Sequence, residues 1–312
     1  VKLAYVTIIN MRRLELLDRH LSSQPLYWVL KNTDIKEFKK VGNLKGKTIV
    51  ITGASRGIGL AIAKKAAADG ANIAILAKTV EPHKKLENTI YTAAKEIEDA
   101  GGRALPIRCD IRFEDQVKSA IEQTVATFGG IDILINNASY IALTPTLDTT
   151  MKSYDLMNSI VARGTFMLSK YCIPHLLKAQ NPHILNITPP INLNPKWLAP
   201  HLAYTIAKYG DSMCVVGLSE EYKGQIGVNA LWPRTTIATA AIRLALGGEP
   251  IMQRSRKVDI MSDAAYTILT SCNKATNGNF FIDDEVVGPV DLKKYNVNPN
   301  IPLEELMPDP YV

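Results

Sequence analysis

Residues 47–59, KTIVITGASRGIG, combine a short apolar run with a glycine-rich turn. The run at 47–52 predicts a buried β-strand, and the sequence from Ile58 onward predicts an Ala-rich helix. Glycines at 53, 57 and 59 let the backbone of the turn approach a phosphate group, and a helix N-terminus presents free N–H groups to it. The stretch therefore predicts a strand–turn–helix unit that binds a nucleotide.

The alternation of strand and helix continues beyond this turn. We expect further strands at 72–78, 103–109, 131–136, 183–188, 226–231 and 279–282. We expect helices at 58–69, 86–100, 113–128, 151–177 (bent at Pro174) and 203–222. Crossovers between parallel strands are right-handed, so the sequence predicts an α/β fold. The expected architecture is a doubly wound, Rossmann-type, mainly parallel seven-stranded sheet with helices on both faces.

Charge divides the 312 residues into parts. Residues 1–45 hold nine Lys or Arg and four Asp or Glu, a net charge of +5, whereas 46–312 hold 27 and 26, a net charge of +1. We expect a basic N-terminal extension at 1–45, a nucleotide-binding domain at 46–283 and a Pro-rich acidic tail at 284–312, which is a linker or a docking segment. The nearly neutral body argues against nucleic-acid binding, which requires a basic face on the fold itself.

Hydropathy and cysteine content limit which classes of protein and which kinds of site are expected. No stretch of about 18 residues is apolar and free of charge, so no membrane span is expected. The four cysteines are far apart in sequence and form no CxxC pair, so we expect neither a disulfide framework nor a metal site. This usage of cysteine is typical of the reducing interior of a cell.

The residues around the glycine turn indicate which nucleotide binds. The second strand ends at Lys78, where NAD-binding proteins usually carry an acidic residue for the ribose 2′-hydroxyl. A cation there, together with Arg56 inside the turn, favours a 2′-phosphate and therefore NADP(H), although Lys78 could also be an ordinary solvated strand end. Asp110 follows the third strand and is placed to meet the adenine. Asn137 follows the fourth strand and either satisfies backbone groups or lines the cofactor. The expected cofactor contacts are Gly53, Ser55, Arg56, Gly57, Ile58, Gly59, Lys78, Asp110, Asn137 and Lys208.

Tyr204 and Lys208 are the candidate catalytic pair. They lie four residues apart on a predicted helix and so share one face. A phenol has a pKa of about 10, and a neighbouring ammonium group lowers that pKa. We expect Tyr204 to exchange a proton with a substrate oxygen while hydride moves to or from the cofactor, and Lys208 to bond the nicotinamide ribose. A chance pairing of Tyr and Lys on a helix is the alternative.

Three motifs together resemble the short-chain dehydrogenase/reductase family over residues 46–283. They are residues 52–59, Asn136-Asn137-Ala138, and Tyr204 with Lys208. The resemblance implies an NADP(H)-dependent oxidoreductase that interconverts a carbonyl and an alcohol on a lipid-like substrate, works as a homo-oligomer, and belongs to lipid metabolism in peroxisomes or mitochondria. Longer relatives that share these motifs carry a C-terminal sterol-carrier domain, which we expect the sequence up to Val312 to lack.

The sequence departs from the family pattern where the substrate oxygen is held. Ile191 replaces the usual Ser about 13 residues before the tyrosine, and Thr188 is the nearby hydroxyl that could substitute for it. Val161 stands where the family has an Asn that organises a relay water, and Pro233-Arg234 replaces the usual Pro-Gly. Losing one oxyanion donor costs about 10²–10³ in rate in other enzymes. Two interpretations therefore stay open: a weakened oxidoreductase, or an NADP-binding regulatory or interaction protein with weak or no catalysis.

Two further segments carry expectations. Residues 234–257 are largely apolar and follow the sixth strand, so we expect them either to cover a lipid-like substrate or to pack on the core or a partner subunit. Residues 13–21, RLELLDRHL, fit a nine-residue peroxisomal import signal and also an amphipathic helix. Glu15 and Asp18 disfavour a mitochondrial presequence, and Pro310-Tyr311-Val312 is not a Ser-Lys-Leu address. We expect an intracellular protein of the peroxisome or mitochondrion.

Overall fold

A computed structural model describes residues 38–82, 88–245 and 247–312 of the protein. Within these ranges seven strands form one parallel sheet in the order β3-β2-β1-β4-β5-β6-β7. The strands are β1 Thr48–Thr52, β2 Asn72–Ala77, β3 Arg103–Arg108, β4 Ile133–Asn136, β5 His183–Asn186, β6 Gly227–Trp232 and β7 Phe280–Ile282. The order reverses between β1 and β4, and the predicted doubly wound α/β fold is confirmed.

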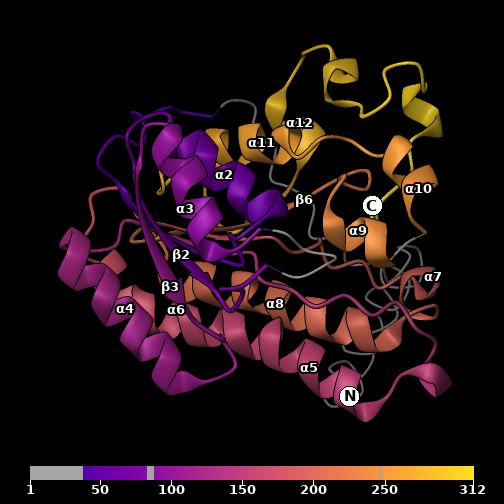
Figure 1. Ribbon diagram of the computed structural model, residues 1–312, viewed down its shortest axis with the longest axis horizontal. Helices are drawn as coiled ribbons and strands as arrows, with labels where there is room; N and C mark the ends of the chain where they lie inside the picture. Colours follow the sequence, from indigo (N-terminus) through magenta and orange to yellow (C-terminus); the bar gives the residue numbers. More distant parts are fainter. Residues whose placement is uncertain (1–37, 83–87, 246) are drawn as a thin grey trace, which may run out of the picture.

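Helices cover both faces of the sheet (Figure 1). One face carries α2 Gly57–Ala67, α3 Ile90–Asp99 and α11 Asp259–Leu269, and the other carries α4 Glu114–Phe128, α5 Met151–Ile160, α6 Ala162–Leu176 and α8 Leu202–Glu221. On β1, Ile49 and Ile51 pack in the first layer, whereas Val50 packs in the second. Parallel strands buried on both faces are continuous apolar runs, which is why β1, β2 and β4 were predictable.

The helix expected at 151–177 is interrupted at Val161, which separates α5 from α6. Val161 has a ψ angle of −68° and is fully buried. Pro174 lies inside α6, which continues through that residue to Leu176, and a bend there stays a prediction. Proline has no N–H group, so the carbonyl oxygen of Lys170 lacks its helical hydrogen-bond donor. Pro174 and Lys170 are both exposed, so water can bond that oxygen instead.

Short elements complete the described ranges. They are α7 Pro195–Leu198, α9 Ala240–Ala245, α10 Glu249–Gln253, α12 Asp283–Val287, and three single 3₁₀ turns at Thr146–Asp148, Leu292–Tyr295 and Leu303–Glu305. No helix in the described part of the chain is long and apolar enough to cross a membrane. The described residues also contain no group of three or more His, Cys, Asp or Glu that could hold a metal ion.

The residues after β7 pack over the sheet at the carboxyl ends of its strands. Tyr295, Leu306 and Tyr311 are all buried, and the chain reaches Val312 beside α9 and α10 (Figure 1). Tyr311 joins a separate apolar cluster with Tyr204 of α8 and Trp232 at the end of β6. The segment 284–312 therefore contributes buried side chains to the region that contains the candidate catalytic tyrosine.

Candidate functional site

The glycine turn connects β1 to α2. Gly53 and Gly57 have φ angles of +68° and +59°, in the left-handed region that favours glycine. A Cβ atom added to Gly59 would lie 2.6 Å from Nδ2 of Asn137 and 3.0 Å from the Cα of Ala54. The absence of side chains at these positions therefore lets the first turn of α2 sit against the end of β4.

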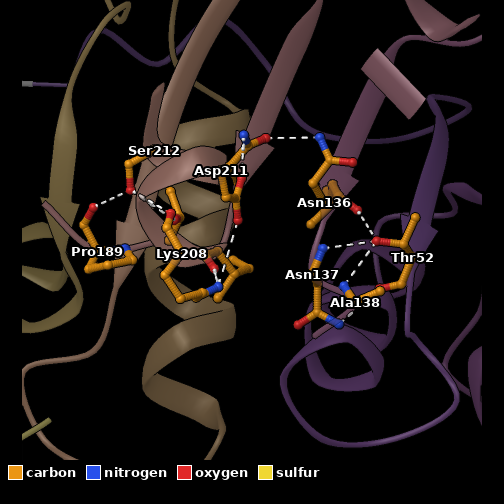
Figure 2. A network of polar contacts seen from close by, with 12 residues as sticks. Thr52, Asn136, Asn137, Ala138, Pro189, Lys208, Asp211 and Ser212 are labelled. Atoms are coloured by element: carbon orange, nitrogen blue, oxygen red, sulfur yellow. Dashed lines mark hydrogen bonds and ion pairs between the residues drawn. The ribbon is translucent and has the colours of Figure 1, made fainter. Parts of the chain in front are cut away.

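Asn137 and Thr52 hold the two strand ends together (Figure 2). The side-chain amide of Asn137 donates to the carbonyl oxygens of Thr52, at 2.9 Å, and Gly53, at 3.3 Å. The backbone N–H groups of Asn137 and Ala138 each donate to Oγ1 of Thr52 at 3.0 Å. Of the two roles left open for Asn137, the structure shows the one that satisfies backbone groups, and a cofactor contact stays a prediction.

The start of α2 fits the phosphates of a dinucleotide. The first turn of this helix carries no acidic residue, and its N-cap, Arg56, makes no capping hydrogen bond through its side chain. Nη2 of Arg56 donates to the backbone oxygen of Asn88 at 2.6 Å, while its Nε is buried without a hydrogen-bond partner among the described residues. A buried unpaired donor costs about 1–3 kcal/mol, so an anion at this turn would relieve an existing cost. Ser55 is buried and Ile58 half-buried in the same turn.

Lys78 and Asp110 lie on neighbouring strands, just beyond the paired ends of β2 and β3. Lys78 is exposed. The carboxylate of Asp110 accepts two hydrogen bonds from Arg112, from Nε at 2.9 Å and from Nη2 at 2.6 Å. Arg112 thereby holds the pKa of Asp110 below its usual range, against the opposing effect of burial. The sequence analysis missed this cation two residues after Asp110, and the adenine contact of Asp110 stays a prediction.

Tyr204 and Lys208 project from α8 into a buried region, where they are 5% and 3% exposed. Nζ of Lys208 donates to the carbonyl oxygen of Ile187 at 2.7 Å and lies 3.7 Å from the carboxylate of Asp211 (Figure 2). The same ammonium group lies 5.2 Å from the ring centre of Trp232. Lys208 is therefore fixed by three neighbours, none of which is Tyr204.

The surroundings of Tyr204 act against the effect expected of Lys208. Burial raises the pKa of Tyr204 well above its ordinary value, and Tyr311, Asp309 and Asp211 raise it further. Burial also lowers the pKa of Lys208, with Asp211 acting in the opposite direction. Burial is the largest of these effects on Tyr204, and a lowering of its pKa by Lys208 stays a prediction.

A chain of buried amides leads from Asp211 to the centre of the sheet (Figure 2). Asn186 donates to Asp211 at 2.9 Å, and Asn136 donates to Asn186 at 2.9 Å. Burial raises the pKa of Asp211 to about 6, and the charge of Lys208 opposes that rise. The sequence analysis missed Asp211, although an acidic residue three positions after Lys208 on a largely apolar helix was a usable signal.

The structure does not bring Thr188 to a substrate position. Its hydroxyl donates to the backbone oxygen of Lys208 at 3.0 Å and shares a 2.9 Å hydrogen bond with Oγ of Ser212. Both partners lie on α8, and Thr188 is fully buried. The hydroxyl therefore serves the packing of β5 against α8, and we do not assign it to the site of the missing Ser. Val161 and Ile191 are buried as well.

The segment 234–257, hereafter the cover segment, is anchored at both ends. Nε of Arg234 pairs with Asp284 at 2.8 Å, and Nη1 of Arg256 pairs with the same carboxylate at 3.1 Å. Between these anchors, Cγ2 of Thr239 would lie 3.4 Å from a Cβ added to Gly57. The cover segment therefore crosses the glycine turn. Arg234, which stands where a Gly was expected, holds the start of this segment through its ion pair with Asp284.

Comparisons with known proteins agree with this architecture. A family model described as short chain dehydrogenase matches residues 47–244. Hydroxysteroid dehydrogenase-like protein 2 of Danio rerio is 58% identical over 271 residues, which cover 87% of this chain and 65% of that protein. The human protein of the same name is 56% identical over 268 residues, which cover 86% and 64%. The chain thus spans slightly less than two thirds of the length of these relatives.

Solved structures give the same result. A short chain dehydrogenase of Mycobacterium thermoresistibile is 52% identical, with a TM-score of 0.81, over 86% of this chain and 96% of that one. A metagenomic short-chain oxidoreductase, solved in complex with NADP, is 25% identical with a TM-score of 0.64, over 77% of this chain and 99% of that one. The range matched by the family model, residues 47–244, includes the glycine turn and α8.

Proposed function

Because the chain belongs to the short-chain dehydrogenase/reductase family, we propose that it is an NADP(H)-dependent oxidoreductase that interconverts a carbonyl and an alcohol. The observation that carries this proposal is the placement of Tyr204 and Lys208. They lie four residues apart on α8, buried at the carboxyl edge of a parallel sheet whose first strand leads into a glycine turn. In open α/β sheets, ligands bind at this edge, where the strand order reverses.

The proposed chemistry assigns one task to each group. A nicotinamide cofactor, when bound, supplies or accepts the hydride. Tyr204 is the candidate group that donates its phenolic proton to the carbonyl oxygen during reduction and takes a proton from the alcohol during oxidation. Lys208, fixed by Ile187 and Asp211, is the candidate partner of the nicotinamide ribose.

The choice of NADP rests on charge. Arg56 offers a buried unpaired donor at the start of α2, and Lys78 is an exposed cation at the end of β2, where an acidic residue would repel a 2′-phosphate. A relative of known structure binds NADP. The remaining cofactor groups in this proposal are Gly53, Ser55, Gly57, Ile58, Gly59, Asp110 and Asn137.

A lipid-like substrate is the second part of the proposal. The cover segment lies over the glycine turn, and its residues Ile237 and Ile242 are buried. Relatives at 56–58% identity are named hydroxysteroid dehydrogenase-like. The apolar residues of this segment suit a substrate with a large hydrocarbon portion.

Replacement of the candidate proton donor tests the proposal. We expect Tyr204→Phe to lower the NADPH-dependent reduction of apolar ketones by about 10²–10⁴-fold, the usual contribution of a positioned acid, with NADPH affinity unchanged. Tyr171→Phe is the control, because Tyr171 lies on α6, away from the candidate pair, and its hydroxyl donates to the carboxylate of Glu114. Undiminished turnover in Tyr204→Phe would contradict the assignment of Tyr204 as the proton donor.

A specific observation favours the second candidate, an NADP-binding regulatory or interaction protein. Val161 is fully buried in an apolar cluster where the family places an Asn, and the hydroxyl of Thr188 is already bonded to α8. Val161→Asn separates the two candidates. A rise in turnover supports the oxidoreductase, whereas NADPH binding without turnover in both proteins supports the regulator.

We also propose a homo-oligomer. Phe166 on α6 and Met213 on α8 are 57% and 55% exposed, and Ile206 and Val216 are exposed nearby in the sequence of α8. Large apolar side chains on two adjacent helices are typical of a protein interface. We expect the wild-type protein to sediment as a dimer or larger, and Phe166→Asp with Met213→Asp to sediment as a monomer.

The cellular location is a separate proposal. The import-like sequence at 13–21 lies outside the described residues. We propose peroxisomal import, with the mitochondrion as the alternative. A fluorescent fusion of the chain should co-localise with a peroxisomal marker and should lose that pattern when Arg13 and His20 are both replaced by Ala.

A further inference from the structure

Tyr311 occupies an enclosure built from aromatic side chains. Its ring centre lies 5.5 Å from that of Tyr209, 6.0 Å from that of His201, and 6.2 Å from those of Trp197 and Trp232. These separations are typical of direct aromatic contact. Tyr311 is 1% exposed, and its hydroxyl shares a 2.9 Å hydrogen bond with Oγ1 of Thr205. The enclosure therefore accepts a flat ring and bonds one oxygen on it.

The backbone of Tyr311 is strained. Its φ angle is +78°, and it is the one non-glycine residue with positive φ in the described part of the chain. For a bulky side chain this conformation costs about 1–3 kcal/mol and persists only when the surroundings impose it. The contacts of the ring in its enclosure outweigh that cost.

Residues 307–312, hereafter the plug segment, lie along the cover segment. Pro308 pairs with Thr235 in an antiparallel bridge. The other anchoring hydrogen bonds run from Thr236 N to Met307 O at 2.9 Å, from Met307 N to Arg254 O at 2.8 Å, from Asp309 N to Arg234 O at 3.0 Å, and from Trp232 Nε1 to Pro310 O at 2.9 Å. The plug segment is therefore held to the cover segment by backbone hydrogen bonds and to β6 by the side chain of Trp232.

The enclosure adjoins the candidate catalytic tyrosine. The ring centre of His201 lies 6.0 Å from that of Tyr204 and 6.0 Å from that of Tyr311. Tyr204, Trp232 and Tyr311 belong to the same apolar cluster, and Thr205, which bonds the Tyr311 hydroxyl, is the next residue after Tyr204. A ligand in the enclosure would therefore lie beside the group that handles the proton.

We propose that this enclosure is the subsite for the apolar part of the substrate, and that Tyr311 is its built-in occupant. The occupant indicates the ligand class: a flat or cyclic apolar group that carries one hydrogen-bonding oxygen. Substrate and Tyr311 compete for the same space, so the plug segment leaves when substrate binds. The link to turnover rests on the proposed function, but the subsite itself can be tested without turnover.

Chemical rescue of a cavity variant is the direct test. Tyr311→Gly removes the ring, and glycine tolerates the positive φ angle. The probe is p-cresol, which is the tyrosine side chain cut at Cβ. We expect p-cresol to raise the Tm of Tyr311→Gly and leave the wild type unchanged. Toluene has the same shape without the oxygen and should bind about fivefold more weakly, the scale of one hydrogen bond.

A second variant locates the bound probe. Thr205→Val in the Tyr311→Gly background should abolish the preference for p-cresol over toluene, because the partner of the oxygen is gone. Equal effects of p-cresol on the wild type and on Tyr311→Gly, or no effect on either, would overturn the proposal. If Tyr311→Gly does not fold, the same comparison is made on Tyr311→Ala with phenol and benzene, which leave room for the Cβ atom.

Kinetics connect the subsite to the proposed function. We expect Tyr311→Gly to reduce 2-tetralone with a kcat/KM about tenfold above the wild type, and p-cresol to inhibit that reaction competitively against the ketone but not against NADPH. Tyr295→Gly opens a cavity elsewhere in the same tail and should show no such competition. Inhibition that is not competitive against the ketone contradicts the subsite. Rescue by p-cresol without turnover in any protein leaves the subsite standing and refutes the proposed function.

Discussion

Nζ of Lys208 lies 3.7 Å from a carboxylate oxygen of Asp211, and each side chain is only 4% exposed. Two charged groups that deep in a protein depend on each other, because neither has water to solvate it. Asp211 is linked in turn to Asn186 and Asn136, so the position of Lys208 is set by the centre of the sheet.

Asp211→Asn should destabilise the protein strongly. Removing one partner of a buried ion pair leaves an uncompensated charge and costs about 3–5 kcal/mol in the free energy of unfolding. Urea unfolding of the variant and the wild type at pH 7 measures this difference. Glu220→Gln is the control, because the Lys223–Glu220 pair on the same stretch of chain is largely exposed and should leave stability unchanged. A loss below 1 kcal/mol in Asp211→Asn would show that the pair does not hold Lys208.

Gly59→Ala should disrupt the glycine turn. The added methyl group would lie 2.6 Å from Nδ2 of Asn137 and 3.0 Å from backbone at Ala54, so the start of α2 must shift. We expect a loss of about 1–3 kcal/mol in unfolding free energy, typical of overpacking, and weaker NADPH binding. Gly130→Ala is the matched control, since a Cβ there meets nothing within 4 Å. Equal stability of the two variants would contradict the close packing of this turn.

Asp309 should make stability fall as pH rises. Burial raises the pKa of Asp309 to about 8, Asp283 of α12 raises it further, and Lys208 of α8 opposes the rise. Between about pH 4 and pH 8 the folded protein retains a proton that the unfolded chain has lost, so stability decreases by at most about 1.4 kcal/mol per pH unit from this group. We expect Asp309→Asn to flatten the dependence, with its largest gain over the wild type near pH 8. Parallel curves from urea unfolding at pH 5, 6, 7 and 8 would refute this role.

The fold could be predicted where local sequence determines it. The strands β1, β2 and β4 are uninterrupted apolar runs, and the glycines after β1 mark the turn into α2. The break at Val161 was not predictable, because it depends on the packing of α5 and α6 and not on a helix-breaking residue. α11, at Asp259–Leu269, was missed because the expected cover ended at residue 257 and no helix was expected between it and the seventh strand. The structure places a crossover helix there, packed on the sheet.

The candidate site could be predicted in position but not in its electrostatics. A four-residue spacing suffices to place Tyr204 and Lys208 on one face of a helix. The pKa of Tyr204 depends on Asp309 and Tyr311, which lie more than 100 positions away and reach the site only because residues 284–312 fold back over it. Arg112 was missed because its ion pair with Asp110 is seen only in the folded chain, whereas Asp211 left a signal in its spacing from Lys208.

Titration of the purified protein with NADPH and with NADH, followed by fluorescence, tests the central claim most directly because it requires no substrate. The account predicts that NADPH binds more tightly than NADH. It also predicts that Lys78→Asp loses about tenfold or more in NADPH affinity, the scale of one charge-assisted hydrogen bond, with NADH affinity unaffected. Failure to bind either nucleotide, or tighter binding of NADH by the wild type, would contradict the account of this protein as an NADP(H)-dependent oxidoreductase.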